Sequence, residues 1–259
     1  MSTQAKTGLR MTRTLADWLH AEPFTLAMSS GFFGFFAHAG MLLALEERSL
    51  LPQRLTGSSA GGLVAGLFGS GLPGDRIRSE LLALERQDFW DPGFGAGLLK
   101  GRLFAAQLER ILPVRLFEEC RYPVSVSVFD IRSRTTRVLR KGALAPALQA
   151  SCTVPFLFQP LWHEGRPLLD GGLCDRPGLH DVQPNERVLY HHLAARSPWR
   201  RATSPQLQIP TRPGLTALVL NDLPVSGPFR MKEGALALRA SHVRTQVALD
   251  QPHQPRVFG

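Results

Sequence analysis

Ser59 lies between Gly57 and Gly61 in the segment T-G-S-S-A-G-G, which has the pattern G-x-S-x-G. Small residues on both sides allow a tight turn from a strand into a helix, and such a turn exposes the serine hydroxyl to a substrate. A partly apolar run at 51–56 precedes the motif, and a stretch rich in Ala, Gly, Leu and Val at 60–68 follows it. The pattern predicts nucleophilic chemistry at a helix N-terminus, where free amides favour negative charge. The alternative is a small-residue turn without chemistry, because the pattern also occurs by chance.

A serine hydroxyl becomes an effective nucleophile only when a base accepts its proton. The segment L-L-D-G-G at 168–172 offers such a base in Asp170. The two leucines predict the end of a buried strand, and Gly171 and Gly172 predict a tight turn directly after it. Partial removal from water raises the pKa of a carboxyl group, which makes it a better base near neutral pH. The alternative is an aspartate that only forms hydrogen bonds within its turn.

Several ordered motifs resemble those of the patatin-like phospholipases, a family of lipid acyl hydrolases. Ser59 in its G-x-S-x-G and Asp170 in its D-G-G resemble the Ser-Asp dyad of that family. The segment A-H-A-G at 37–40 resembles the A-H-x-G helix of the family, and A-S-C-T-V-P at 150–155 resembles its A-S-x-x-x-P segment. The resemblance covers residues 24–180, and includes a G-x-x-x-x-D-G-G strand and turn that ends in Gly172.

The resemblance implies a mechanism that needs no histidine. Asp170 accepts the proton of Ser59 while the hydroxyl attacks an ester carbonyl, and water then hydrolyses the acyl-enzyme with Asp170 again as the base. The resemblance also implies a loop that binds the oxyanion, for which the equivalent segment is S-S-G-F-F-G-F-F at 29–36. The backbone amides of Gly31 and Phe32 are the candidate donors of this oxyanion hole.

This loop departs from the family pattern G-G-G-x-R/K-G. When the segment is aligned back from His38, only Gly31 of the glycine triplet is kept, and Gly34 stands at the basic position. Phenylalanine resists backbone angles that glycine permits. The departure is therefore expected to affect the geometry of the oxyanion hole and the rate of ester hydrolysis. The aromatic side chains predict either core packing or a hydrophobic wall for an acyl chain; they are Phe32, Phe33, Phe35 and Phe36, with Phe156, Phe158 and Trp162 as further candidates.

Strands and helices are expected to alternate around these motifs. The expected strands are 23–28, 122–130, 135–140, 186–193 and 215–220, and the expected helices are 35–48, 75–88, 103–112, 143–151 and 231–249. This alternation predicts an α/β fold with a mainly parallel central sheet, and the resemblance implies a three-layer α/β/α sandwich. We expect an N-terminal leader at 1–22, a single hydrolase domain at 23–259, and an exposed loop at 195–214.

Composition limits the class of protein. The 259-residue chain contains no run of about 18 apolar residues, so we expect no membrane-spanning helix. Its three cysteines have no regular spacing, which is typical of a reducing compartment and predicts neither a disulfide framework nor a metal site. We therefore expect a cytoplasmic protein that uses no metal and no cofactor.

The net charge is +9, and the densest basic cluster lies at 132–141. A basic surface attracts nucleic acid or anionic lipid headgroups. No nucleic-acid-binding module accompanies the charge, so we expect no nucleic-acid partner. Two explanations of the basic surface stay open, a solvated basic face and peripheral contact with an anionic membrane. The family resemblance implies a lipid or lysolipid ester as the substrate. The sequence does not predict the oligomeric state.

Two other functions stay open. The altered oxyanion loop is compatible with a catalytically weak or inactive protein that binds lipid or a partner. An α/β-hydrolase triad needs a histidine after Ser59 in the chain. His180, His191, His192 and His242 are available for it, although the D-G-G context fits a dyad better.

Overall fold

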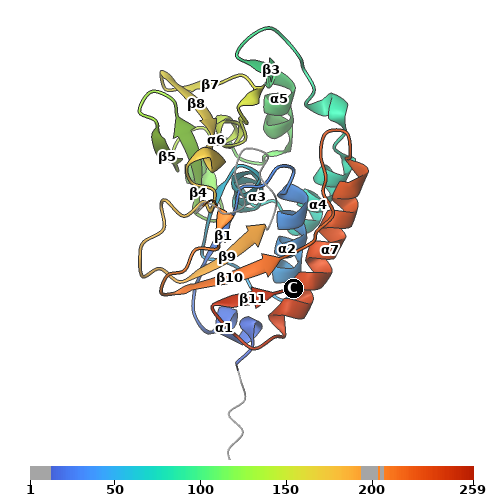
Figure 1. Ribbon diagram of the computed structural model, residues 1–259, viewed down its shortest axis with the longest axis vertical. Coiled ribbons are helices and arrows are strands. Elements are labelled where there is room, and N and C mark those ends of the chain that lie inside the picture. The colour runs from blue at the N-terminus through green and yellow to red at the C-terminus, as the bar shows by residue number, and fades with distance from the viewer. Residues whose placement is uncertain (1–12, 194–203, 205–206) are drawn as a thin grey trace, which may run out of the picture.

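The centre of the fold is a parallel sheet, because helices separate the apolar runs of the sequence and provide the crossover connections that parallel strands need. The computed structural model describes residues 13–193, 204 and 207–259 (Figure 1). The strands of the main sheet are β1 (Thr25–Met28), β2 (Arg54–Ser58), β4 (Val124–Asp130), β5 (Thr135–Leu139), β7 (Leu161–His163), β8 (Arg166–Asp170), β9 (Val188–Leu193), β10 (Leu215–Leu220) and β11 (Arg256–Phe258).

The strand order is β11-β10-β9-β1-β2-β4-β8-β7, and β5 also pairs with β4. Every pair from β11 to β4 is parallel, whereas β5, β7 and β8 join in antiparallel pairs. Two short strands, β3 (Gly97–Leu99) and β6 (Phe156–Phe158), form a separate parallel pair. The expected α/β class with a mainly parallel central sheet is confirmed.

Seven α-helices flank the sheet in the described residues. They are α1 (Leu15–Ala21), α2 (Phe35–Glu47), α3 (Ala60–Gly69), α4 (Gly74–Ala83), α5 (Arg102–Ile111), α6 (Leu144–Ser151) and α7 (Lys232–Leu249). Helix α3 packs against β1, β2 and β4, and helix α2 lies between α3, α4 and α7. None of the helices in the part that the structure describes is long and apolar enough to cross a membrane.

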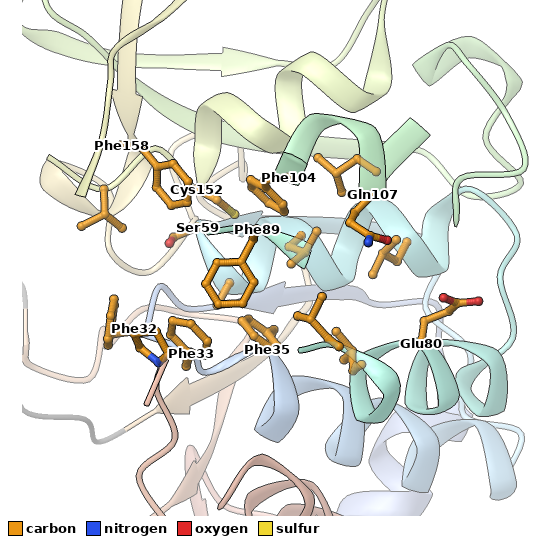
Figure 2. A pocket seen from close by; sticks show the side chains of 18 of the residues that line it. Phe32, Phe33, Phe35, Ser59, Glu80, Phe89, Phe104, Gln107, Cys152 and Phe158 are labelled. Atoms are coloured by element: carbon orange, nitrogen blue, oxygen red, sulfur yellow. The ribbon is translucent and has the colours of Figure 1, made fainter. Parts of the chain in front are cut away.

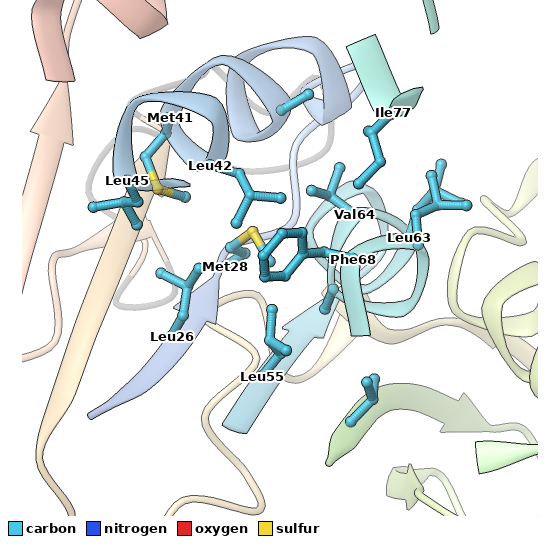
Figure 3. Packing of buried hydrophobic residues seen from close by; sticks show 14 of the residues in the cluster. Leu26, Met28, Met41, Leu42, Leu45, Leu55, Leu63, Val64, Phe68 and Ile77 are labelled. Carbon is cyan, nitrogen blue, oxygen red and sulfur yellow. The ribbon is translucent and has the colours of Figure 1, made fainter. Parts of the chain in front are cut away.

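The main hydrophobic core lies between the sheet and helices α2, α3 and α4. Leu26 and Met28 of β1 and Leu55 of β2 point toward Leu42 and Phe68 on the helices (Figure 3). Alternate residues of a strand point to opposite faces, so Ala27 joins a second cluster on the other face. In the described residues that face is covered by loop side chains; they include Leu179, Val182 and Ile209.

Helix α1 is tied to the C-terminal segment of the chain. The Thr14 hydroxyl accepts the backbone N–H of Asp17, and the Asp17 carboxylate accepts that of Thr14, which forms a capping box. Leu15 and Leu19 are buried, and the N–H of Leu15 donates to the carbonyl of Gln251 at 2.9 Å. The helix therefore packs in the main core although it falls within the range 1–22 expected to be a leader; residues 1–12 lie outside the described part.

The register of strand β4 brings Ser59 and Asp170 together. Strand β2 runs beside the first half of β4, where Ser58 pairs with Ser127. Strand β8 runs the opposite way beside the second half, where Asp170 pairs with Val128. Since Ser127 and Val128 are consecutive in β4, strands β2 and β8 meet end to end. The residues at the carboxyl ends of β2 and β8 therefore become neighbours.

Candidate active site

Ser59 occupies the turn between strand β2 and helix α3. Its backbone has φ 53° and ψ −123°, a conformation that L-residues rarely adopt and that the surrounding structure must hold in place. Gly57 and Gly61 make the turn possible because each lies so close to neighbouring backbone that a side chain would not fit. A Cβ on Gly57 would lie 2.5 Å from the carbonyl carbon of Gly61, and one on Gly61 would lie 2.2 Å from the carbonyl oxygen of Met28.

The Ser59 hydroxyl donates a hydrogen bond of 2.6 Å to Oδ2 of Asp170. The other carboxylate oxygen, Oδ1, accepts the backbone N–H of Gly172 at 2.7 Å, which fixes the orientation of the carboxylate. Only 8% of Ser59 and 6% of Asp170 is exposed. Gly171 allows the turn to lie against strand β4, because a Cβ there would lie 2.0 Å from the carbonyl oxygen of Ser127.

Ser151 holds the backbone of the Ser59 turn. Its hydroxyl accepts the N–H of Ser59 at 2.9 Å and donates to the carbonyl of Ser127 at 2.8 Å. The sequence gives Ser151 no individual role, although its A-S-x-x-x-P motif marks the segment. The contact depends on helix α6 packing against α3 and β4, which no local pattern predicts.

The loop that follows strand β1 lies next to Ser59. Gly31 and Phe32 line the same cavity as Ser59, and the N–H of Gly34 donates to the carbonyl of Gly31 at 2.9 Å. Phe32 is exposed, and Phe33 has a left-handed φ of 55°. The turn thus places a phenylalanine where glycine is usual, so it stores backbone strain.

A buried arginine lies beneath this loop. The Arg176 carbonyl accepts the N–H of Ser30 at 2.7 Å, and its guanidinium donates to the carbonyl of Leu193 at 2.8 Å. Arg176 thereby ties the loop to the end of strand β9, where the Leu193 N–H donates to the Ser29 hydroxyl. No pattern in the sequence singles out Arg176, whose only local signal is its position shortly after the D-G-G turn.

His38 and His191 are buried against each other. Nε2 of His38 donates to the carbonyl of Ser29 at 2.7 Å, and its Nδ1 lies 2.8 Å from Nδ1 of His191. Burial lowers the pKa of His38 to about 4 and holds that of His191 well below its ordinary value, so both rings are neutral at neutral pH. No histidine among the described residues lines the cavity at Ser59, so the geometry gives a triad no support.

Cys152 is a second nucleophile-bearing residue at the cavity. Burial, followed by the negative charge of Asp170, raises the pKa of its thiol well above the usual value. A neutral thiol is a poor nucleophile, so Cys152 serves as an apolar part of the wall.

An apolar cavity opens beside Ser59. Its aromatic lining includes Phe33, Phe35, Phe89, Phe104 and Phe158 (Figure 2). Of the phenylalanines considered for this wall, Phe36 is instead buried in the core. Phe156 and Trp162 are exposed and lie outside the lining, so the prediction that they contribute to the wall is wrong.

A family model of patatin-like phospholipases matches residues 26–182, more than half of the chain. The chain belongs to this family, whose members are generally lipid acyl hydrolases. It is 28% identical over 154 residues to an uncharacterised NTE family protein of Mycobacterium tuberculosis, with 58% of this chain and 42% of that protein covered.

A putative patatin-like phospholipase domain-containing protein of Caenorhabditis elegans is 28% identical over 149 residues, 52% of this chain and 13% of that protein. The chain thus spans less than half the length of these curated relatives. The crystal structure of VipD from Legionella pneumophila has the same fold, with a TM-score of 0.60 and 15% sequence identity. The match covers 89% of this chain and 67% of the VipD chain.

Proposed function

We propose that this protein is a serine acyl-ester hydrolase, of phospholipase or lysophospholipase type, in which Ser59 and Asp170 act as a dyad through an acyl-enzyme. The observation that carries the proposal is the 2.6 Å hydrogen bond from the Ser59 hydroxyl to Asp170, next to an apolar cavity. A base at this distance can accept the proton as the hydroxyl attacks. Family membership supports the class of reaction.

The first half of the reaction transfers the acyl group to Ser59. Oδ2 of Asp170 accepts the hydroxyl proton while Ser59 Oγ forms a bond to the ester carbonyl carbon. The oxyanion that results is stabilised by the amides of Gly31 and Phe32 and by the N-terminus of helix α3. When the intermediate collapses, Asp170 returns the proton to the leaving alcohol.

The second half releases the acyl group as a carboxylic acid. Asp170 accepts a proton from water, and the water oxygen attacks the acyl carbonyl of the acyl-enzyme. Collapse of this intermediate returns the proton to Ser59. The hydrogen bond from the Gly172 N–H keeps the carboxylate aimed at Ser59 throughout, because it holds Oδ1 and leaves Oδ2 for proton transfer.

We also propose that the protein acts in the cytoplasm, in peripheral contact with an anionic membrane. Phe32 is exposed and lines the cavity, while Phe229 is exposed next to the lining residue Pro228. The guanidinium of Arg86 lies 5.1 Å from the Phe229 ring, so a cation sits beside an exposed aromatic group. Apolar and cationic groups together favour an anionic lipid surface. Equal binding to neutral and anionic vesicles in a flotation assay would contradict this part.

A catalytically weak lipid- or partner-binding protein is the second candidate. The observation that favours it is the phenylalanine pair in the oxyanion loop, with Phe33 in a left-handed conformation. Hydrolysis of nitrophenyl esters over several chain lengths separates the two candidates. Turnover no greater than that of Ser59→Ala at every chain length favours binding alone.

Labelling with a fluorophosphonate tests the dyad. We expect stoichiometric labelling of the unaltered protein, none of Ser59→Ala, and strongly slowed labelling of Asp170→Asn, which keeps the shape and removes the base. Labelling that survives in Ser59→Ala would contradict the assignment of the nucleophile, and unchanged labelling of Asp170→Asn would contradict the assignment of the base.

A further inference from the structure

The cavity beside Ser59 follows one face of helix α3. Ser59, Leu63 and Leu67 are spaced by four residues, so they share that face, and all three line the cavity. With a rise of 1.5 Å per residue, Leu63 lies about 6 Å and Leu67 about 12 Å from Ser59 along the helix axis. The cavity therefore has a definite direction away from Ser59.

The two ends of this cavity differ in chemistry. Helices α4 and α5 complete its apolar wall; their side chains include Leu81, Phe104, Leu108 and Ile111. Three polar lining residues, Glu80, Gln107 and Arg110, also belong to these helices. Figure 2 shows Gln107 and Glu80 away from Ser59, beyond the ring of Phe89.

An ion-pair cluster closes the far end. Arg110 of α5 donates to Glu80 of α4 at 2.7 Å and to Gln107 at 3.0 Å, while Arg76 donates to the second oxygen of Glu80 at 2.9 Å. The Glu80 side chain is only 14% exposed and is held by both arginines, whose own side chains are 62% (Arg76) and 58% (Arg110) exposed. A methyl end that reached this cluster would separate the largely buried Glu80 carboxylate from its arginine partners, which is unfavourable.

We propose that the Glu80–Arg110 pair ends the acyl-chain site and gives the protein a preference for medium-length chains. A fully extended polypeptide advances roughly 3.3–3.6 Å per residue of three bonds, so an extended alkyl chain advances roughly 1.2 Å per bond. About 12 Å between Ser59 and Leu67 therefore holds about ten bonds. This inference rests on the proposed function, because attack by Ser59 fixes the carboxyl end of the chain.

Binding of free fatty acids tests the length limit without turnover. Saturated acids of increasing length displace an apolar fluorescent dye from the Ser59→Ala protein, below their critical micelle concentrations. We expect affinity to rise about fourfold per methylene, from about 0.8 kcal/mol for each buried CH₂, and to level off near ten carbons. A fourfold rise that continues well past this length would overturn the proposal.

Substitutions along the cavity move the limit by different amounts. Leu63→Phe is expected to shorten the limit more than Leu67→Phe, since Leu63 is one turn nearer to Ser59, and Glu80→Ala is expected to lengthen it. Leu82→Phe adds the same kind of bulk at an exposed position of α4 and is expected to change nothing. An unchanged limit in Glu80→Ala would overturn the proposal, and this substitution carries the test if the buried leucine variants fail to fold.

Ester hydrolysis by the unaltered protein separates this inference from the proposed function. A length limit in fatty-acid binding without hydrolysis of any ester would contradict the proposed function alone. Hydrolysis with no length limit would contradict only the role of the ion pair.

Discussion

Ser151→Ala removes the hydrogen bonds that hold the Ser59 turn without touching the cavity lining. The hydroxyl bonds both the N–H of Ser59 at 2.9 Å and the carbonyl of Ser127 at 2.8 Å, and Ser151 is fully buried. Its loss removes the hydroxyl that accepts the buried Ser59 N–H and takes one donor from the carbonyl of Ser127. A buried group left without a partner costs about 1–3 kcal/mol and an ordinary hydrogen bond contributes about 1 kcal/mol, so we expect the free energy of unfolding to fall by roughly 3 kcal/mol.

This loss is large enough to measure and has a second consequence. A domain of this size loses about 2–4 °C of Tm per kcal/mol, so Tm is expected to fall by roughly 6–12 °C. The Ser59 backbone, at φ 53°, also loses a contact that holds its strained conformation. A misplacement of about 1 Å at a reacting group can slow the reaction about 100-fold, so labelling by a fluorophosphonate is expected to slow by a comparable factor.

Ser241→Ala is the matched control. The Ser241 hydroxyl is equally buried and donates to the carbonyl of Ala37 at 2.6 Å, between helices α7 and α2. We expect it to lower stability but leave the labelling rate of the folded protein unchanged. Thermal unfolding and labelling rates, both measured well below Tm, give the two readouts. Equal labelling rates for Ser151→Ala and Ser241→Ala would refute the role assigned to Ser151.

Two further predictions follow from backbone strain and buried histidines. Ser59→Gly is expected to be more stable than Ser59→Ala by about 1–2 kcal/mol in urea unfolding, because glycine adopts φ 53° without strain; equal stability would contradict strain at this turn. The pKa values of His38 and His192 are lowered to about 4 by burial, so below pH 6.5 the unfolded chain binds protons that the folded protein does not. The free energy of unfolding should therefore be flat above pH 6.5 and fall by about 1.4 kcal/mol per pH unit per histidine between pH 6 and 4.5, and an unchanged value over this acidic range would contradict the lowered pKa values.

Local patterns in the sequence were sufficient to predict the α/β class and most of the long elements. The helix expected at 35–48 is α2, and the helix expected at 231–249 is α7. Strand β11 and the pair β3–β6 were missed, because each of these strands has three residues and depends on pairing with a distant segment. The helix expected at 75–88 ends at Ala83, where Leu84 turns to an extended conformation.

The site shows the same division between local and tertiary information. Ser59 and Asp170 lie in motifs whose glycines indicate tight turns with close backbone contacts. Both could therefore be predicted from the sequence as candidate site residues. Ser151 and Arg176 act through contacts with segments far away in the chain, and neither has a local pattern that states its role. The phenylalanines after strand β1 predicted either core packing or an acyl-chain wall, and the sequence did not decide between them. The proposed closure of the cavity by Glu80 and Arg110 depends on how helices α4 and α5 pack.

The most direct test of the central claim is a double-mutant comparison of kcat/KM for a nitrophenyl ester of about ten carbons. A positioned general base contributes about 10²–10⁴-fold, so Asp170→Asn is expected to lose at least 100-fold, and Ser59→Ala should lose all turnover above background. Residues that act as a unit show losses that do not add, so the double variant is expected to be no slower than Ser59→Ala. An Asp170→Asn protein that keeps kcat/KM within threefold of the unaltered protein would contradict the dyad.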